Sequence, residues 1–263
     1  MKKYWTVFKT EFQKSSEYRL EFFGHMIMGL FTFAVMVFVF RAIFQGNPEI
    51  AGYTFSSVFT YLVMTKFLHP AIRWNVARLL ADEIKEGRLS AYLLKPFGVL
   101  RYWFSLFWAD RLVDILIRLS LIVAFLVLLP RYFSFPGFGT TLSFGLSLVL
   151  ALFLNFTFNI LLSLFAFWVT DIRLFSTAID LAVGFFAGAL VPLDFLPGIL
   201  KPASFFLPFQ YLLYFPIRVF QGAVGPEQTW VGMLISLGWL VALLILLDYF
   251  WRKGIKHYEA IGQ

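Results

Sequence analysis

The sequence contains no cysteine, which excludes disulfide bonds, thiolate metal sites and a cysteine nucleophile. Charge is scarce as well, because Asp, Glu, Lys and Arg make up 14% of the chain, against about 25% in an average soluble domain. The three histidines are far apart and fit no H-E-x-x-H motif or comparable metal spacing. The chain therefore lacks the common sequence signals of a metal site or a thiol-dependent active site.

The sequence also lacks the motifs of nucleotide binding and of hydrolase chemistry. It has no G-x-x-x-x-G-K-[ST] segment to hold phosphates, and no G-x-S-x-G elbow to present a serine nucleophile. The net charge is +7, but no basic patch falls on a soluble module of the kind that binds nucleic acid. We therefore expect that this chain is not an enzyme, holds no cofactor or metal itself, and binds no nucleic acid.

Long apolar segments dominate the sequence instead. The chain is 60% hydrophobic with 35 phenylalanines, and several runs exceed the roughly 18 residues that mark a membrane-spanning helix. These runs predict an all-α polytopic membrane protein that forms a single transmembrane domain over residues 1–263. Six spans are expected, at residues 22–44, 53–74, 112–129, within 140–169, 176–191 and 229–251.

The distribution of basic residues predicts the orientation of these spans. Sixteen Lys and Arg residues fall in the N-terminal segment, residues 73–111, the 170–174 turn and the C-terminal tail, whereas four fall on the opposite side. Because basic residues concentrate in cytoplasmic loops, both termini are predicted to be cytoplasmic. Residues 1–21 carry three aromatic residues at helical spacing with lysines nearby, so we expect an amphipathic interface helix and no cleavable signal.

Residues 192–217 are apolar but contain five prolines, so a continuous seventh helix is not expected there. We predict short external helices that re-enter the outer leaflet before the last span. Such helices must be packed against protein, because lipid cannot satisfy irregular backbone. An ordinary apolar external loop is the alternative.

Polar residues inside the spans form two sets. Asn155, Asn159 and Ser163 recur every four residues, so they share one face of the fourth span and indicate either hydrogen bonds between helices or a translocation path or subunit seam. The second set lies at the start of the third span and indicates a polar gate or charged seam at the inner mouth, or a simple anchor. Its residues are Asp110, Arg111, Asp114 and Arg118.

Two further groups of residues are noted. Gly184 and Gly188 form a small-xxx-small pair, which is typical of close helix packing. The remaining single charges within the apolar segments have no evident partner in the sequence, and no role is assigned to them. They are Lys66, Asp180, Asp194 and Asp248.

The cytoplasmic segment 75–111 contains the stretch DEIKEGRLSAYLLKPFG, residues 82–98. Asp82 is suited to cap a first short helix that Gly87 ends, and a second short helix from Leu89 is stopped by Pro96. Leu89, Tyr92 and Leu93 share one face of that second helix. Because a helix of about eight residues is not stable alone in water, it must dock on the membrane, on its own bundle or on a partner.

These residues resemble a known family. The run Glu86-Gly87-x-Leu89 followed by Leu93-Leu94-x-Pro96 is similar to the E-x-G-x-L…L-L-x-P signature in the first cytoplasmic loop of type-2, export-class permeases of ATP-binding-cassette transporters. GALVPLDFLP and FFLPFQYLLYFPIRVFQG, before the last span, resemble a second characteristic region of that family. The resemblance extends over essentially the whole chain, and it is strongest to bacterial permeases of about 260 residues.

The resemblance implies a mechanism. In that family the loop forms a coupling helix that fits a groove of a separate ATPase subunit, which binds ATP and Mg²⁺ and drives alternating access in a pair of permease subunits. The matching residues are Glu86, Gly87, Leu89, Leu93, Leu94 and Pro96, and Glu83, Lys85, Arg88 and Tyr92 are contacts by proximity. We therefore expect an exporter subunit in a bacterial plasma membrane, with a second permease subunit, identical or related. A channel or secondary transporter without an ATPase, or a membrane scaffold, are the alternatives.

Overall fold

The computed structural model describes residues 19–72, 76–95, 98–128, 130, 136–169 and 173–258, and these residues form helices and turns but no strand. The predicted interface helix at 1–21 lies outside the described residues, apart from its last three positions, which begin the first helix. The elements, in order, are α2 (Arg19–Ile43), α3 (Phe55–Ile72), α4 (Val76–Lys85), α5 (Leu89–Leu93), α6 (Val99–Leu128), α7 (Phe138–Leu164), η2 (Phe165–Phe167), α8 (Arg173–Phe186), η3 (Leu193–Phe195), α9 (Leu200–Phe206), η4 (Pro208–Leu212), α10 (Tyr214–Phe220) and α11 (Pro226–His257).

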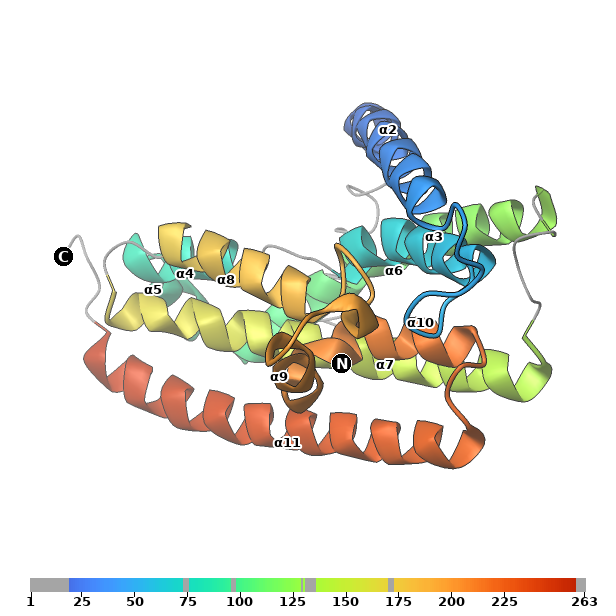
Figure 1. Cartoon of the computed structure of the whole chain (residues 1–263). Helices are drawn as coiled ribbons and strands as arrows, with labels where there is room; N and C mark the ends of the chain where they lie inside the picture. The colour runs from blue at the N-terminus through green and yellow to red at the C-terminus, as the bar shows by residue number, and fades with distance from the viewer. Residues whose placement is uncertain are drawn as a thin grey trace.

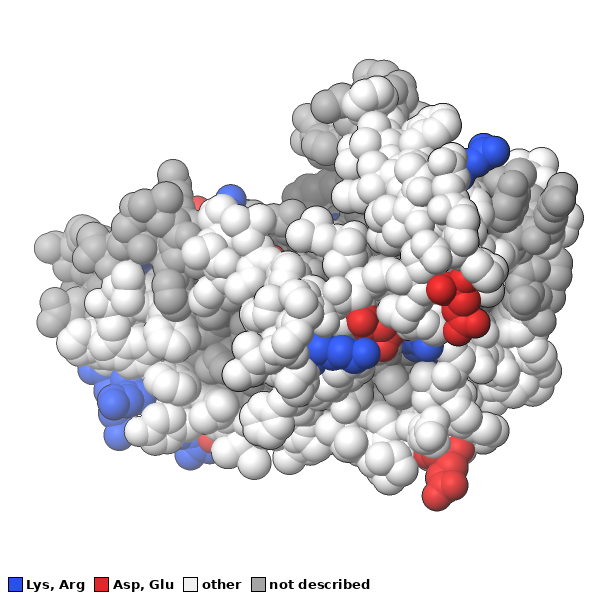
Figure 2. All heavy atoms as spheres, in the orientation of Figure 1, with Lys and Arg blue, Asp and Glu red and all other residues white. Residues whose placement is uncertain are grey.

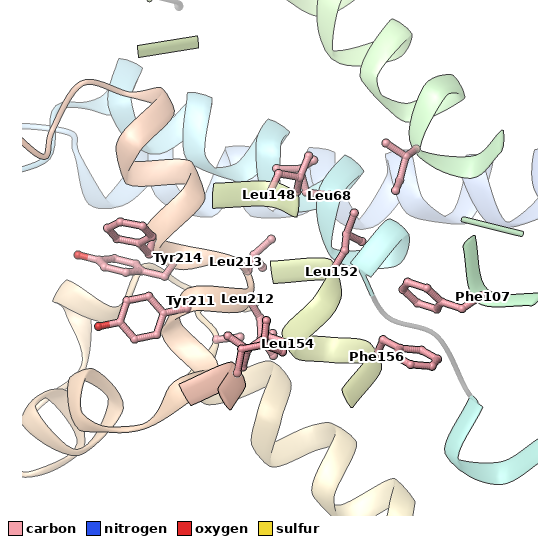
Figure 3. Packing of buried hydrophobic residues seen from close by; sticks show 14 of the residues in the cluster. Leu68, Phe107, Leu148, Leu152, Leu154, Phe156, Tyr211, Leu212, Leu213 and Tyr214 are labelled. Carbon is pink, nitrogen blue, oxygen red and sulfur yellow. The ribbon is translucent and has the colours of Figure 1, made fainter. Parts of the chain in front are cut away.

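Helix α7 is the centre of the bundle. It contains no charged residue, and α11 packs along its length while α4 and α10 pack against it elsewhere (Figure 1). Leu148, Leu152, Leu154 and Phe156 of α7 lie among side chains of α3, α6, η4 and α10 in Figure 3. Burying one such side chain stabilises the folded chain by about 1.5–3 kcal/mol. The apolar side chains of α7 are therefore the core against which α4, α10 and α11 pack.

Two described helices are long and apolar enough to cross a membrane by length and composition, namely α7 with η2 and α11. Shorter apolar helices cover residues 31–43 and 176–186. In α11 only a third of the most apolar window is buried inside the protein, so most of this helix presents aliphatic side chains outward. The predicted all-helical character is confirmed for the described residues, and the number of six spans stays a prediction.

The charged segment between the second and third predicted spans differs in detail from the prediction. Helix α6 begins at Val99 and runs without a break for 30 residues, so the segment 75–111 ends inside a helix. Helix α4 runs to Lys85, and Asp82 lies in its last turns. The prediction that Asp82 begins a helix as its cap is therefore wrong. The helix begins six residues earlier, at Val76, and an Asp in the sequence does not reveal whether a helix starts at it or already contains it.

We call residues 192–220 the proline-rich segment. As predicted, it is a series of short elements (η3, α9, η4 and α10) rather than one helix. Both η4 and α10 pack on α7, and their residues are mostly buried. In Figure 1, α9 lies at the mid-length of α11, away from both ends of that helix. The segment is thus packed against protein, and its depth in a membrane stays a prediction.

Two glycines of α11 set how closely neighbouring segments approach it. A Cβ added at Gly232 would overlap the ring of Phe215 from α10, and one added at Gly254 would overlap the ring of Phe167 from η2. Each aromatic ring therefore lies directly on the helix backbone. Sequence reasoning missed both sites, although Gly232 and Ser236 form a small-xxx-small pair; Gly254 has no small residue four positions away.

Candidate functional site

The short helix α5 is attached to the protein at its first residues. Leu89 is fully buried, and the backbone N–H of Ser90 donates to the hydroxyl oxygen of Tyr258 across 3.1 Å. Before it, Gly87 has a φ of +72°, a left-handed conformation that glycine adopts without a Cβ clash. The predicted break at Gly87 is therefore present, and it turns the chain so that the start of α5 docks on its own bundle.

The polar residues around α5 interact with one another. Arg88 pairs with Glu83, with Nη2 3.0 Å from Oε1, and also with Glu86. The hydrogen bond to Glu83 raises the pKa of Arg88, which stays cationic. The ring of Tyr92 packs against that of Tyr102 on α6, and partial burial raises the pKa of Tyr92. These contacts hold α5 between the end of α4 and the start of α6.

The last residues of α5 are exposed. Leu93 is 41% exposed, and Leu94, which follows directly, is 88% exposed. The predicted apolar face is thus divided: Leu89 and Tyr92 contact the bundle, whereas Leu93, and Leu94 just after the helix, present hydrocarbon outward. Lys85 is partly buried at the end of α4, and Pro96 lies outside the described residues. We call residues 76–95 the coupling segment from this point on.

Three charged residues on α6 form one cluster. Asp114 accepts hydrogen bonds from Arg118 (Nε to Oδ1, 2.8 Å) and from Arg111 (Nη1 to Oδ2, 3.3 Å). Arg111 also donates to the backbone carbonyl of Pro70 on α3 across 3.3 Å. The cluster therefore joins α6 to α3, and Asp114 and Arg118 form an ion pair one helical turn apart. The side chain of Asp110 lies outside the part of the chain that the structure describes.

The predicted polar face of α7 is buried. The amide nitrogen of Asn159 donates to both the backbone carbonyl (2.9 Å) and the side-chain oxygen (3.0 Å) of Asn155. Ser163 donates to the backbone carbonyl of Ile160 across 2.5 Å. These bonds stay within α7. The side chains of Asn155 and Asn159 also line a cavity of about 40 Å³ together with His69 of α3 and Asp180 of α8, with room for a few water molecules.

A second cavity, of about 150 Å³, lies between α2, α3 and residues 189–190, and Lys66 lines it. His69 lines both cavities, so the two spaces lie against one side chain of α3. A lysine near the centre of a membrane-spanning helix costs about 2.5–3.5 kcal/mol on insertion scales. Lys66 and Asp180, for which the sequence indicated no role, each line one of these two cavities.

The two glycines predicted as a packing pair do not share a helical face. Gly184 lies in α8, but Gly188 follows its end with a φ of +80°. The N–H of Ala189 bonds to the carbonyl of Gly184 (2.9 Å) and that of Gly188 to Phe185 (3.1 Å), which is the Schellman ending of a helix. Close approach does occur at Gly188, because its carbonyl accepts the hydroxyl of Tyr61 across 2.7 Å.

Sequence reasoning missed a polar cluster that fixes the proline-rich segment. Asp194 accepts hydrogen bonds on Oδ2 from Tyr53 (2.7 Å) and Tyr214 (2.6 Å), and Lys201 lies 3.8 Å from its Oδ1. The guanidinium of Arg218 lies 4.5 Å from the centroid of the Tyr53 ring. Only Tyr53 lies outside the segment, so this cluster ties the segment to the start of α3.

Other charged groups suggest no separate site. Asp248 pairs with Arg252 one turn later on α11, at 2.9 Å. Among the described residues, no three His, Asp or Glu side chains come together as a metal site would require.

A family model of ABC-2 transporter proteins matches residues 17–262. The chain belongs to the ABC-2 transporter family. The match covers nearly the whole sequence, and it confirms the resemblance first carried by residues 86–96 and 188–222. Membership makes this a membrane protein and implies a permease subunit of an ATP-binding-cassette transporter whose ATPase is a separate protein. Comparison with curated proteins finds no match.

Proposed function

We propose that this chain is the membrane-spanning permease subunit of an ATP-binding-cassette exporter, and that a separate ATPase subunit moves it through α5. The observation that carries the proposal is the divided face of α5. Leu89 fixes the helix to the bundle, while Leu93 and Leu94 present apolar side chains away from it. An exposed apolar end on so short a helix is what a groove in a partner would cover.

The packing of the coupling segment offers a route for the motion. Helix α4 packs against α7 and α8, and the guanidinium of Arg78 donates to Ser176 and Thr177 on α8 (3.2 and 2.7 Å). A displacement of α5 would therefore be passed through α4 to two helices of the bundle. ATP and Mg²⁺ bind in the ATPase subunit, this chain catalyses no reaction itself, and alternating access follows from the movement of the helices.

The proposed topology has six spans with both termini in the cytoplasm of a bacterial cell, in its plasma membrane. Basic side chains gather in Figure 2 at the end of the molecule where α11 finishes, which supports that orientation by the positive-inside rule. A second permease subunit completes the transporter. Helix α2 packs chiefly on α3 and leaves Phe31 and Phe38 about 70% exposed, so it offers apolar surface to lipid or to that subunit.

The topology is tested with single cysteines, because the natural chain has none to interfere. A membrane-impermeant thiol reagent should label Glu227→Cys in intact cells and Leu94→Cys only in inverted vesicles. Labelling of both positions from the same side would contradict the six-span arrangement.

The function is tested by purifying the chain with its transporter partner. The ATPase subunit should copurify with the wild-type chain, and Leu94→Asp should reduce its recovery about tenfold or more, because a charge replaces an apolar contact. The matched control is Ile199→Asp, which places the same charge at a residue 80% exposed in the chain before α9. Equal recovery of the ATPase with both variants would contradict the proposal.

A further inference from the structure

Lys66 is a cation placed deep along an apolar helix. It lies 11 residues after the start of α3, about 16 Å along the helix axis, which is close to the middle of a hydrocarbon core about 30 Å thick. Within the part of the chain that the structure describes, Lys66 has no hydrogen bond and no carboxylate within 4.0 Å. Charged groups at such depth are normally paired or face a polar cavity, and they mark functional sites.

The cavity beside Lys66 combines two kinds of lining. Thr32, Thr65 and His69 supply polar groups, and the rest of the wall is hydrocarbon and an aromatic ring. The apolar members are Phe33, Met36, Leu62, Pro70, Ala189 and Leu190. At about 150 Å³ the space is of the size that holds a benzene-sized group, unlike the smaller cavity on the other side of His69.

The position of the ammonium is set by the neighbouring helix. A Cβ at Gly29 of α2 would lie 2.7 Å from Cε and 2.9 Å from Nζ of Lys66, so the absence of a side chain there leaves room for the lysine. Arg118 on α6 adds a second positive charge near Lys66, although it is itself paired with Asp114. Because Lys66 lines the cavity and no described Asp or Glu does, the cavity favours a negative ligand rather than a cation.

We propose that the Lys66 cavity binds the anionic headgroup of an amphiphile, a phosphate or carboxylate with an apolar tail. The ammonium and the hydroxyls of Thr32 and Thr65 match an oxyanion, and the apolar wall and adjoining helices match the tail. This proposal rests on the proposed function in one respect only. If the chain is a transporter subunit, the ligand is either the transported cargo or a resident lipid of the transporter.

Binding is tested on the purified chain in mixed micelles that contain equal phosphatidylglycerol and phosphatidylcholine, with retained lipid measured by native mass spectrometry. The wild-type chain should retain phosphatidylglycerol in preference. Lys66→Gln should lower that retention about tenfold, and Lys66→Arg should largely preserve it, because the positive charge remains. The control Lys253→Gln removes an exposed lysine of α11 and should leave retention unchanged. Equal retention by Lys66→Gln and the wild type overturns the proposal.

A second variant keeps the charge and moves it. Gly29→Ala places a methyl group 2.9 Å from Nζ of Lys66, so the ammonium has to shift and phosphatidylglycerol retention should fall although no charge is lost. Unchanged retention in Gly29→Ala would contradict the placement of the site between Gly29 and Lys66. Retention of inorganic phosphate by the wild-type chain without retention of phosphatidylglycerol would overturn the requirement for a tail.

A transport assay distinguishes the two sources of the ligand, transported cargo and resident lipid. In vesicles with the ATPase subunit, ATP-dependent movement of labelled phosphatidylglycerol that Lys66→Gln abolishes identifies the anionic amphiphile as cargo, and retention without movement identifies it as a resident lipid. Failure of the proposed function is distinguishable, because it would appear as loss of ATPase binding. Lys66→Gln should keep ATPase recovery, while Leu94→Asp should keep lipid retention.

Discussion

The coupling segment and the proline-rich segment are both sets of short helices between longer ones, but they differ in how completely their side chains are buried within the chain. The coupling segment buries Leu89 and leaves Leu94 almost wholly exposed. The proline-rich segment buries most of η4 and α10 and ties itself to α3 through Asp194. One segment presents an apolar end away from the bundle, and the other closes its contacts within the chain.

This difference indicates what each segment is built to do. A short helix is stabilised by what it docks on, because it is too short to be stable alone. The carboxylate of Asp194 contacts Tyr214 and Lys201 within the proline-rich segment and Tyr53 outside it, so this segment docks within the chain. In the coupling segment Leu89 and Tyr92 are docked on the bundle, which leaves Leu93 and Leu94 to an external surface. The following changes test that contrast, from the largest expected effect to the smallest.

Leu89→Ala and Leu94→Ala compare the buried start of α5 with the exposed residue that follows its end. Leu89→Ala should lower the free energy of unfolding by about 2–5 kcal/mol, because it leaves a cavity at a fully buried site. Leu94→Ala should change it by less than about 0.5 kcal/mol, as expected for an exposed side chain, yet weaken ATPase binding. Thermal unfolding of the purified chain measures the first effect, and equal losses of stability would break the contrast.

Asp194→Ala should destabilise the proline-rich segment by about 2–4 kcal/mol, because two buried tyrosine hydroxyls lose a charged acceptor. Asp194→Asn keeps one acceptor oxygen and should lose about half as much. Proteolysis of the purified chain and its unfolding temperature measure the effect. A fully stable Asp194→Ala would mean that the segment is held by its apolar packing alone.

Gly232→Ala should cost about 1–3 kcal/mol, since the added methyl group overlaps the ring of Phe215 and the packed ring has to move. Gly238→Ala is the matched control on the same helix, because nothing lies within 4 Å of a Cβ there. Unfolding temperatures of the two variants measure the difference, which should vanish if α10 is not seated on α11.

Tyr258→Phe should have the smallest effect, about 0.5–1.5 kcal/mol, because it removes the one hydrogen bond from the backbone of Ser90 to the tyrosine hydroxyl. Hydrogen exchange of the Ser90 amide is the direct measurement and should accelerate in the variant. Unchanged exchange would show that the Tyr258 hydroxyl does not hold the start of α5.

The residue types alone were sufficient to predict the breaks between helices. Gly87 marks the break between α4 and α5, and the five prolines predict short elements instead of one helix over residues 192–217, because these residue types limit the backbone directly. Contacts between distant residues could not be predicted in this way: Asp194 meets Tyr53, which lies 141 residues earlier. Spacing also misled at Gly188, since a four-residue interval does not reveal that α8 ends between the two glycines.

Within the coupling segment, the sequence predicted an apolar face but could not say which of its members the protein itself would bury. Leu89 and Leu93 differ by about one helical turn, and only the packing of α4, α6 and Tyr258 distinguishes them. The Lys66 cavity was equally invisible, because its walls come from α2, α3 and residues 189–190.

The most direct test of the coupling role is a cross-link between α5 and the ATPase subunit. A photoreactive amino acid placed singly at positions 89, 93, 94 or 227 of the chain is activated in the assembled transporter, and cross-linked products are identified by mass. We expect cross-links to the ATPase from positions 93 and 94 and none from 89 or 227. An assembled transporter in which position 227 cross-links to the ATPase and position 94 does not would contradict the coupling role of α5.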